Sequence, residues 1–266
     1  MPLTASAGWA QELAAWAIDP RILAAAPESP WDFPPALFKA DRRADAVGGL
    51  GATVERVAEI LHDGGSVVDV GCGGGGATIP ALSSGVVAVG VDESKAMLEE
   101  YATAAAARGA LVHTVHGTYP DVSAQIPLSD VVVAANIVYN VPAIDVFLRA
   151  LAGQATRRVV IELTERHPMT SLGPLWLHFH GQTRPSGPTY EHFLAVLQEL
   201  GFGYQIELGQ REPTIRTADP EAYAEWTRRR LCLGPERQPE VDRLLAEMGP
   251  PPLTNVATIW WDCPAA

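Results

Sequence analysis

The chain has 266 residues, of which 47% are hydrophobic and 19% are charged, and its formal net charge is −12. This acidic balance argues against a protein that grips bare nucleic acid, because phosphate neutralisation needs a surplus of lysine and arginine. No apolar run approaches the roughly 20 residues of a membrane span, and the N-terminus lacks the pattern of a signal peptide, so we expect a cytoplasmic protein that does not enter a membrane.

The first 44 residues predict a helical N-terminal extension. Apolar residues at helical spacing open it, and the segment "PESPWDFPPALF" at 27–38 contains prolines that favour an ordered arm. Two roles stay open for this arm: Trp31 and Phe33 line an acceptor pocket as part of a lid, or they bury a flank of the main domain. A helix is expected over 45–61, because a pair of glycines follows it.

From Ser66 onwards, short apolar strands alternate with amphipathic helices. Seven strands are expected, at 66–70, 86–91, 111–115, 130–136, 157–163, 204–208 and 255–261. Such an alternation implies a mostly parallel sheet with helices on both faces, which is a Rossmann-like, doubly wound α/β fold. Two further helices form an insertion at about 218–249. No linker marks a second domain, so 1–266 is interpreted as one domain with its core at 45–266.

A run of four glycines follows the first of these strands, within "VVDVGCGGGGATIPAL" at 67–82. Ligands of open α/β sheets bind beyond the carboxyl ends of the strands, and glycines let the backbone approach them closely. The run matches two templates. Gly71, Gly73 and Gly76 satisfy the G-x-G-x-x-G pattern of dinucleotide binding. Gly71, Gly73 and Gly75 satisfy a second pattern, G-x-G-x-G.

Two acidic residues help to separate the templates. Asp69 lies two residues before the first glycine, where a carboxylate suits a cationic ligand and is unhelpful beside a pyrophosphate. Asp92 closes the second strand in "GVDES", where an acid can accept both hydroxyls of a ribose. The pair predicts an adenosine-containing cofactor with a positively charged end.

Four motifs resemble those of the class I S-adenosylmethionine-dependent methyltransferases over roughly Asp45 to Trp261: "VVDVGCGGGG", "GVDES", "VHGTYPD" and "SDVVVAANIVYNVP". The family has a seven-stranded sheet whose last strand is antiparallel and inserted beside the fifth. The strands expected at 204–208 and 255–261 are similar to that closing pair. The resemblance implies methyl transfer with S-adenosyl-L-methionine as the cofactor.

The resemblance also implies roles for individual residues. The glycines would lie against the methionine part, Asp69 would position its amino group, Asp92 would bind the ribose with Glu93 nearby, and Asn136 would face the transferable methyl. Where the family often has an acid that binds adenine, this chain has Thr118. The cofactor site implied in this way comprises Asp69, Gly71, Gly73, Gly75, Asp92, Glu93, Gly117, Thr118 and Asn136.

Methyl transfer needs alignment of the acceptor with the sulfonium methyl, and a general base helps when the acceptor carries a proton. Polar and aromatic residues cluster in the segment after the fifth strand, where His167 is the preferred base. His178 and Tyr139 are further catalytic candidates, and for each of the three the alternative is a hydrogen-bonded packing or surface residue. The histidines and the three cysteines lack metal-ligand spacing, so no metal is expected.

The acceptor is expected to be a small molecule methylated on oxygen or nitrogen. An RNA or protein acceptor, an NAD-type oxidoreductase, and a non-catalytic relative that only binds the cofactor are the alternatives. The order and direction of the last two strands would separate the oxidoreductase from the methyltransferase. A homodimer is possible, since "TIWW" at 258–261 packs either in the core or at a dimer contact.

Overall fold

The structure is a computed structural model, and it describes residues 3–31, 51–62, 64–212 and 219–264. A seven-stranded sheet in the order β3-β2-β1-β4-β5-β7-β6 forms its centre. The five strands from β3 to β5 are parallel, and β7 is antiparallel to both of its neighbours. The strands are β1 (Ser66–Val70), β2 (Val87–Asp92), β3 (Leu111–His116), β4 (Ser129–Ala135), β5 (Ala155–Thr164), β6 (Gln205–Arg211) and β7 (Thr254–Asp262). The predicted Rossmann-like α/β fold is confirmed.

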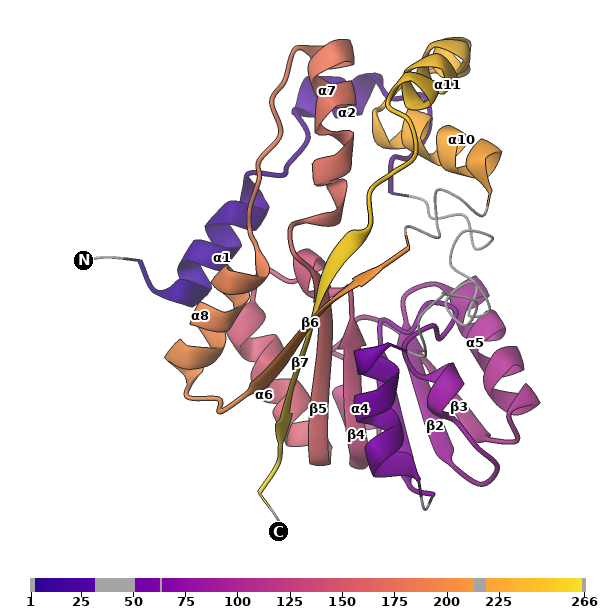
Figure 1. Cartoon of the computed structure of the whole chain (residues 1–266), viewed down its shortest axis with the longest axis vertical. Coiled ribbons are helices and arrows are strands. Elements are labelled where there is room, and N and C mark those ends of the chain that lie inside the picture. The colour runs from indigo at the N-terminus through magenta and orange to yellow at the C-terminus, as the bar shows by residue number, and fades with distance from the viewer. Residues whose placement is uncertain (1–2, 32–50, 63, 213–218, 265–266) are drawn as a thin grey trace.

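Helices cover both faces of the sheet (Figure 1). Successive strand residues point to opposite faces, so Val67 of β1 packs in one apolar cluster and Val68 in the other. The first cluster includes α4 (Ala52–Leu61) and α5 (Lys95–Ala107), and the second includes α1 (Ala5–Ala14), α6 (Ile144–Gln154) and α8 (Tyr190–Leu200).

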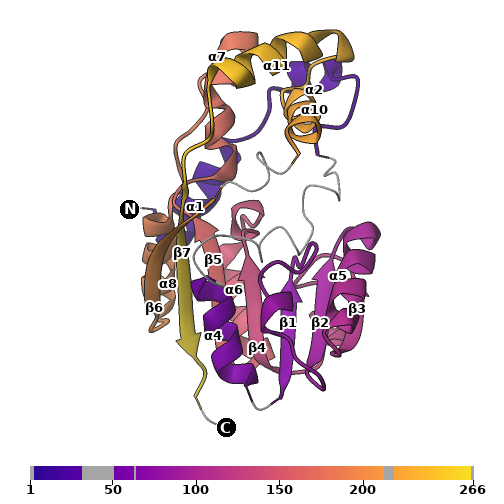
Figure 2. The same ribbon diagram turned by 45° about the vertical axis from the view of Figure 1, so that its right-hand side comes forward.

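Four helices form a separate layer, which we call the cap. They are α2 (Pro20–Ala25), α7 (Gly173–His180), α10 (Pro220–Arg230) and α11 (Gln238–Glu247). Figures 1 and 2 show the cap beyond the carboxyl ends of the parallel strands. It has an apolar cluster of its own, in which Trp176 of α7, Trp226 of α10 and Val241 of α11 are buried. The cap therefore covers the edge of the sheet at which ligands bind in this fold.

Some boundaries differ from the sequence-based expectation. The helix expected over 45–61 is described only from Ala52 as α4, and residues 32–50, with Phe33 of the proposed lid, lie outside the described residues. Trp31 lies at the end of the described arm and is 54% exposed. The inserted helices α10 and α11 lie between β6 and β7, as expected.

The aromatic pair near the C-terminus lies in the core. Trp260 packs in the cluster with α4 and α5, and Trp261 packs in the cluster on the opposite face. Both are buried within the chain, so this segment supplies no exposed dimer contact. None of the helices in the described part of the chain has the length and apolar composition of a transmembrane span.

Candidate functional site

The glycine loop, residues 71–76, directly follows β1. Gly71, Gly73 and Gly75 have positive φ of 65°, 50° and 84°. A Cβ at Gly71 would lie 2.4 Å from Ile137, and one at Gly75 would lie 2.3 Å from Ile79, whereas a Cβ at Gly73 would meet nothing within 4 Å. Protein packing thus requires two of the glycines, and the third presents bare backbone to open space.

Asp92 lies beside this open backbone at the end of β2. Its Oδ2 accepts the N–H of Gly73 at 2.9 Å, and its Oδ1 accepts the N–H of Ser94 at 2.8 Å. Each carboxylate oxygen has a second lone pair. The carboxylate is therefore fixed next to the loop and can still accept the two hydroxyls of a ribose, so loop and acid together fit an adenosine cofactor.

The end of β3 meets the end of β2 through two contacts. The hydroxyl of Thr118 donates to Oε1 of Glu93 at 2.7 Å, and the N–H of Gly117 donates to the carbonyl of Asp92 at 3.0 Å. An exposed carboxylate from Glu93 thereby lies against Thr118, the residue that stands where the family often has its adenine-binding acid. The sequence pattern alone gave no sign of this pairing.

Asp69 lies inside the protein, under the loop. It is 1% exposed, and its Oδ2 accepts the hydroxyl of Thr78 at 2.6 Å. The carboxylate thereby ties β1 to the segment that follows the glycines. A role for Asp69 at the amino group of the cofactor is indirect in this geometry.

Asn136 occupies the turn after β4 with a positive φ of 61°. Its backbone N–H donates to the carbonyl of Glu162 at 2.7 Å, and its Nδ2 donates to Oε1 of the same residue at 2.7 Å. Arg211 of β6 pairs with that oxygen at 2.5 Å and reaches Oδ1 of Asn136 at 3.3 Å. Thr53 of α4 donates to Oε2 of Glu162 at 2.7 Å. These contacts hold the Asn136 amide at the carboxyl edge of the sheet.

Glu162 and Arg211 were missed as site residues. The signal for Glu162 is a single acid in an otherwise apolar strand, in "VVIEL", because a buried charge needs a partner. Arg211 carries no such signal, since the pairing joins two strands that are far apart in the sequence.

Tyr139 and His167 lie together at the ends of β4 and β5, with ring centroids 5.3 Å apart. The Tyr139 hydroxyl donates to the carbonyl of Thr164 at 2.6 Å, and burial raises the pKa of this phenol. The His167 ring stacks on Trp16 at 4.0 Å, and its Nδ1 accepts the N–H of Met169 at 3.2 Å. Both side chains are therefore packed and already hydrogen bonded.

The surroundings of His167 keep its ring neutral. Burial lowers its pKa to about 4, and the positive charges of Arg184 and Arg230 act in the same direction. Because Nδ1 accepts a backbone N–H, the neutral ring carries its proton on Nε2. The imidazole is thus a weak base at neutral pH that offers an N–H donor.

His178 lies apart from this pair, in the last turn of α7. Its Nε2 is 2.9 Å from Oε1 of Glu240 on α11, and 43% of its side chain is exposed. The sequence groups His178 with His167, but the structure puts the two rings in different surroundings.

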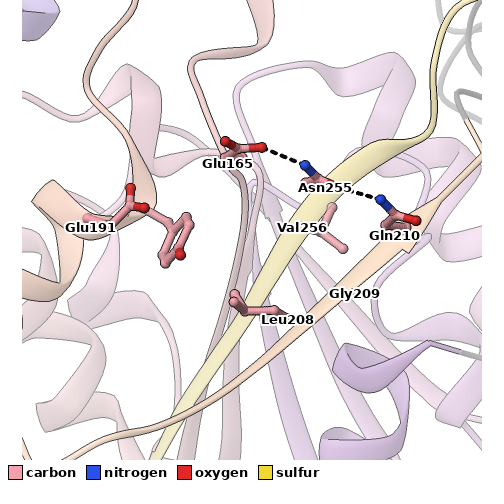
Figure 3. A pocket seen from close by; sticks show the side chains of 8 residues that line it. Glu165, Glu191, Leu208, Gly209, Gln210, Asn255 and Val256 are labelled. Atoms are coloured by element: carbon pink, nitrogen blue, oxygen red, sulfur yellow. Dashed lines mark hydrogen bonds between the residues drawn. The ribbon is translucent and has the colours of Figure 1, made fainter.

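A pocket of about 370 Å³ lies elsewhere, at the outer edge of the sheet (Figure 3). It is lined by β6 and β7 together with Glu165, Tyr190 and Glu191, and Asn255 bridges it by donating to Glu165 at 2.6 Å and accepting from Gln210 at 2.8 Å. No residue expected at the cofactor site lines this pocket, so it is not the site built around the glycine loop.

Comparison with known proteins agrees with this geometry. The family model described as a methyltransferase domain matches residues 67–155, which run from β1 to the start of β5. The insertion of antiparallel β7 between β5 and β6 supplies the closing pair that a dinucleotide-binding dehydrogenase does not require. Residues 67–155 thus form a methyltransferase domain, within a sheet of the class I methyltransferase order.

Solved structures share the fold of this methyltransferase at low sequence identity. A SAM-dependent methyltransferase from Geobacter sulfurreducens, in complex with S-adenosyl-L-homocysteine, is 18% identical with a TM-score of 0.51, over 87% of this chain and 99% of that one. Magnesium protoporphyrin IX methyltransferase from Synechocystis PCC 6803, with bound SAH, is 17% identical with a TM-score of 0.50, over 80% of this chain and 83% of that one. A search of the curated proteins found no match.

The cofactor of the methyltransferase is S-adenosylmethionine. When bound, it supplies an activated methyl group on a sulfonium centre. The open backbone at Gly73, the fixed carboxylate of Asp92 and the acid of Glu93 beside β3 would hold it, because they present hydrogen-bonding groups and no bulky side chain.

Proposed function

We propose that this methyltransferase transfers the methyl group to an oxygen or nitrogen of a small molecule held between the carboxyl edge of the sheet and the cap. The observation that carries the proposal is the cap itself, a helical layer over the edge that bears the glycine loop (Figure 2). A layer of helices beyond that edge favours a small acceptor over a macromolecule, and the net charge of −12 disfavours RNA.

On the cofactor side, we propose that Gly73 and its flanking glycines adjoin the methionine part and that Asp92 accepts the ribose hydroxyls. Gly117 and Thr118 would adjoin adenine, with Glu93 in the place of the usual acid. Asn136, fixed by its amide contacts, would face the methyl-bearing end.

On the acceptor side, we propose that Tyr139 and His167 position the acceptor. Bound S-adenosylmethionine would supply the methyl group to an acceptor oxygen or nitrogen, and the acceptor's proton would pass to solvent. His167 contributes its Nε2–H as a donor, because its weak basicity makes it a poor proton acceptor. His178 takes no part in this arrangement, since it pairs with Glu240.

The proposal is tested with methyl-labelled S-adenosylmethionine and three acceptor panels: small phenols, amines and carboxylic acids; bulk tRNA; and histones. We expect label transfer to members of the small-molecule panel alone. Transfer to tRNA or histones, with none to small molecules, would contradict the proposed acceptor class.

A further inference from the structure

A partly buried arginine lies at the junction between the cap and the sheet. Arg184 follows α7, and its guanidinium lies 5.2 Å from the ring centre of Trp16 and 4.7 Å from that of Trp176. Its Nη atoms donate to the backbone carbonyls of Trp16 and Ala17. Two indoles and two backbone carbonyls thus fix the position of the cation.

The charge of Arg184 has no acidic counterpart among the residues that the structure describes. No carboxylate pairs with it there, and its buried Nε finds no hydrogen-bond acceptor among the same residues. Burying a cation is costly unless an anion or a set of acceptors compensates it.

A second arginine also lies among indole rings. Arg230, in the last turn of α10, is 9% exposed and lies over the rings of Trp31 and Trp226 at 5.5 Å and 5.3 Å. The positive charges of both arginines act to lower the pKa of His167 and that of the Cys232 thiol, and burial of Cys232 acts in the opposite direction.

The junction is connected to the methyl-transfer end of the sheet by ring contacts. Tyr139 lies 5.3 Å from His167, His167 lies 4.0 Å from Trp16, and Trp16 lies 5.2 Å from the Arg184 guanidinium. A small molecule that lies along these rings would have one end near Tyr139, after the turn of Asn136, and the other end near Arg184.

We infer that Arg184 binds an oxyanion of the acceptor, a carboxylate or a phosphate, beside His167. Guanidinium groups match both anions through paired hydrogen bonds. The inference rests on the proposed function, since it assigns a chemical class to the acceptor of that same site.

The test uses isothermal titration of the full chain, saturated with S-adenosylhomocysteine, with 1-naphthoate, 1-naphthyl phosphate and the neutral 1-naphthamide as probes. We expect at least one of the two anions to bind about tenfold tighter than the amide. The tighter anion identifies carboxylate or phosphate chemistry. Arg184→Gln should remove the preference, and Arg184→Lys should keep part of it, because lysine retains the charge without the planar fork.

Arg243→Gln is the matched control, because Arg243 is an exposed arginine on α11 that pairs only with nearby Glu247 in the described chain, and this variant should keep the preference. Equal binding of the three probes to the wild-type protein overturns the inference, as does a preference that survives Arg184→Gln. Failure of the wild-type protein to bind S-adenosylhomocysteine would instead count against the proposed function, so the two failures are distinguishable.

Discussion

The imidazole of His167 stacks on the indole of Trp16, with ring centroids 4.0 Å apart and planes inclined by 17°. The indole N–H of Trp16 donates to the carbonyl of Gly187 at 2.6 Å. The N-terminal arm, the end of β5 and the segment after α7 therefore meet at one point. This meeting point partly buries His167 and brings it near two arginines, which is why its pKa is low.

The low pKa of His167 predicts a pH dependence of stability. Its folded-state pKa is about 4, against 6.5 for the unperturbed group. Between these values the unfolded chain takes up a proton that the folded chain does not, so stability falls as pH falls, by at most about 1.4 kcal/mol per pH unit. Urea unfolding at pH 7 and pH 5 should show a smaller loss in His167→Gln than in wild type.

The control for this experiment is His113→Gln, which removes an exposed histidine on β3. This variant should lose as much stability between the two pH values as the wild-type protein. An equal loss in His167→Gln and wild type would show that His167 is not held neutral.

The glycine loop predicts different effects at two positions. Gly75→Ala should destabilise the protein by about 1–3 kcal/mol, because its Cβ would lie 2.3 Å from Ile79 at a positive φ. Gly73→Ala has no such clash, so it should cost only about 1 kcal/mol of backbone strain. Its methyl enters the open space that we assign to the cofactor, and binding of S-adenosylhomocysteine should weaken about tenfold or more.

Thermal unfolding and calorimetric titration of both variants check these expectations. Unchanged affinity in Gly73→Ala would mean that the cofactor does not lie against this backbone.

The hydrogen bonds that join Glu162 to Asn136, Arg211 and Thr53 predict that Glu162→Gln destabilises the protein. The variant weakens the charged contacts with Arg211 and Thr53, so the free energy of unfolding should drop by about 2–3 kcal/mol. Asn136 would lose its fixed orientation, and kcat should fall more than cofactor affinity. Glu247→Gln, which removes an exposed pair with Arg243, should cost less than about 1 kcal/mol. Equal stabilities of the two variants would contradict the network.

Tyr139→Phe separates a positioning role from a catalytic one. The hydroxyl donates to the carbonyl of Thr164, so its loss should cost about 1 kcal/mol of stability. The stack with Trp9 at 5.7 Å remains, and the rate of methyl transfer should stay within about threefold of wild type. A rate loss of about a hundredfold in steady-state turnover would make the hydroxyl part of the chemistry.

The fold was accessible from sequence because it is dictated by local patterns. Continuous apolar strands, helical spacing between them and glycines in the first loop each act over a few residues. Local residue types do not set the start of α6: Asn140 and Pro142 are typical of a helix N-terminus, yet the helix begins at Ile144. Val138 and Tyr139 are buried, which draws residues 138–140 into a separate turn before the helix can start.

The contacts around the proposed acceptor site could not be predicted from the sequence in the same way. The contacts of Glu162 with Arg211, and of Arg184 with Trp16, join residues that are far apart in the chain and carry no shared motif. Sequence patterns identified His167 as polar and close to the strand end. Its low pKa depends on burial by the arm and on arginines from the cap, which only the tertiary structure brings together.

The most direct test of the account is calorimetric titration of the protein with S-adenosylhomocysteine and NADH, in wild type and in Asp92→Asn. The control is Asp130→Asn. The carboxylate of Asp130 likewise accepts a backbone N–H, that of Ser66 at 2.8 Å, but it lies at the amino ends of the parallel strands, away from the glycine loop. We predict binding of S-adenosylhomocysteine with a Kd of about 1–10 μM, no binding of NADH, and a loss of affinity in Asp92→Asn alone. Binding of NADH without S-adenosylhomocysteine, or full affinity in Asp92→Asn, would contradict the account.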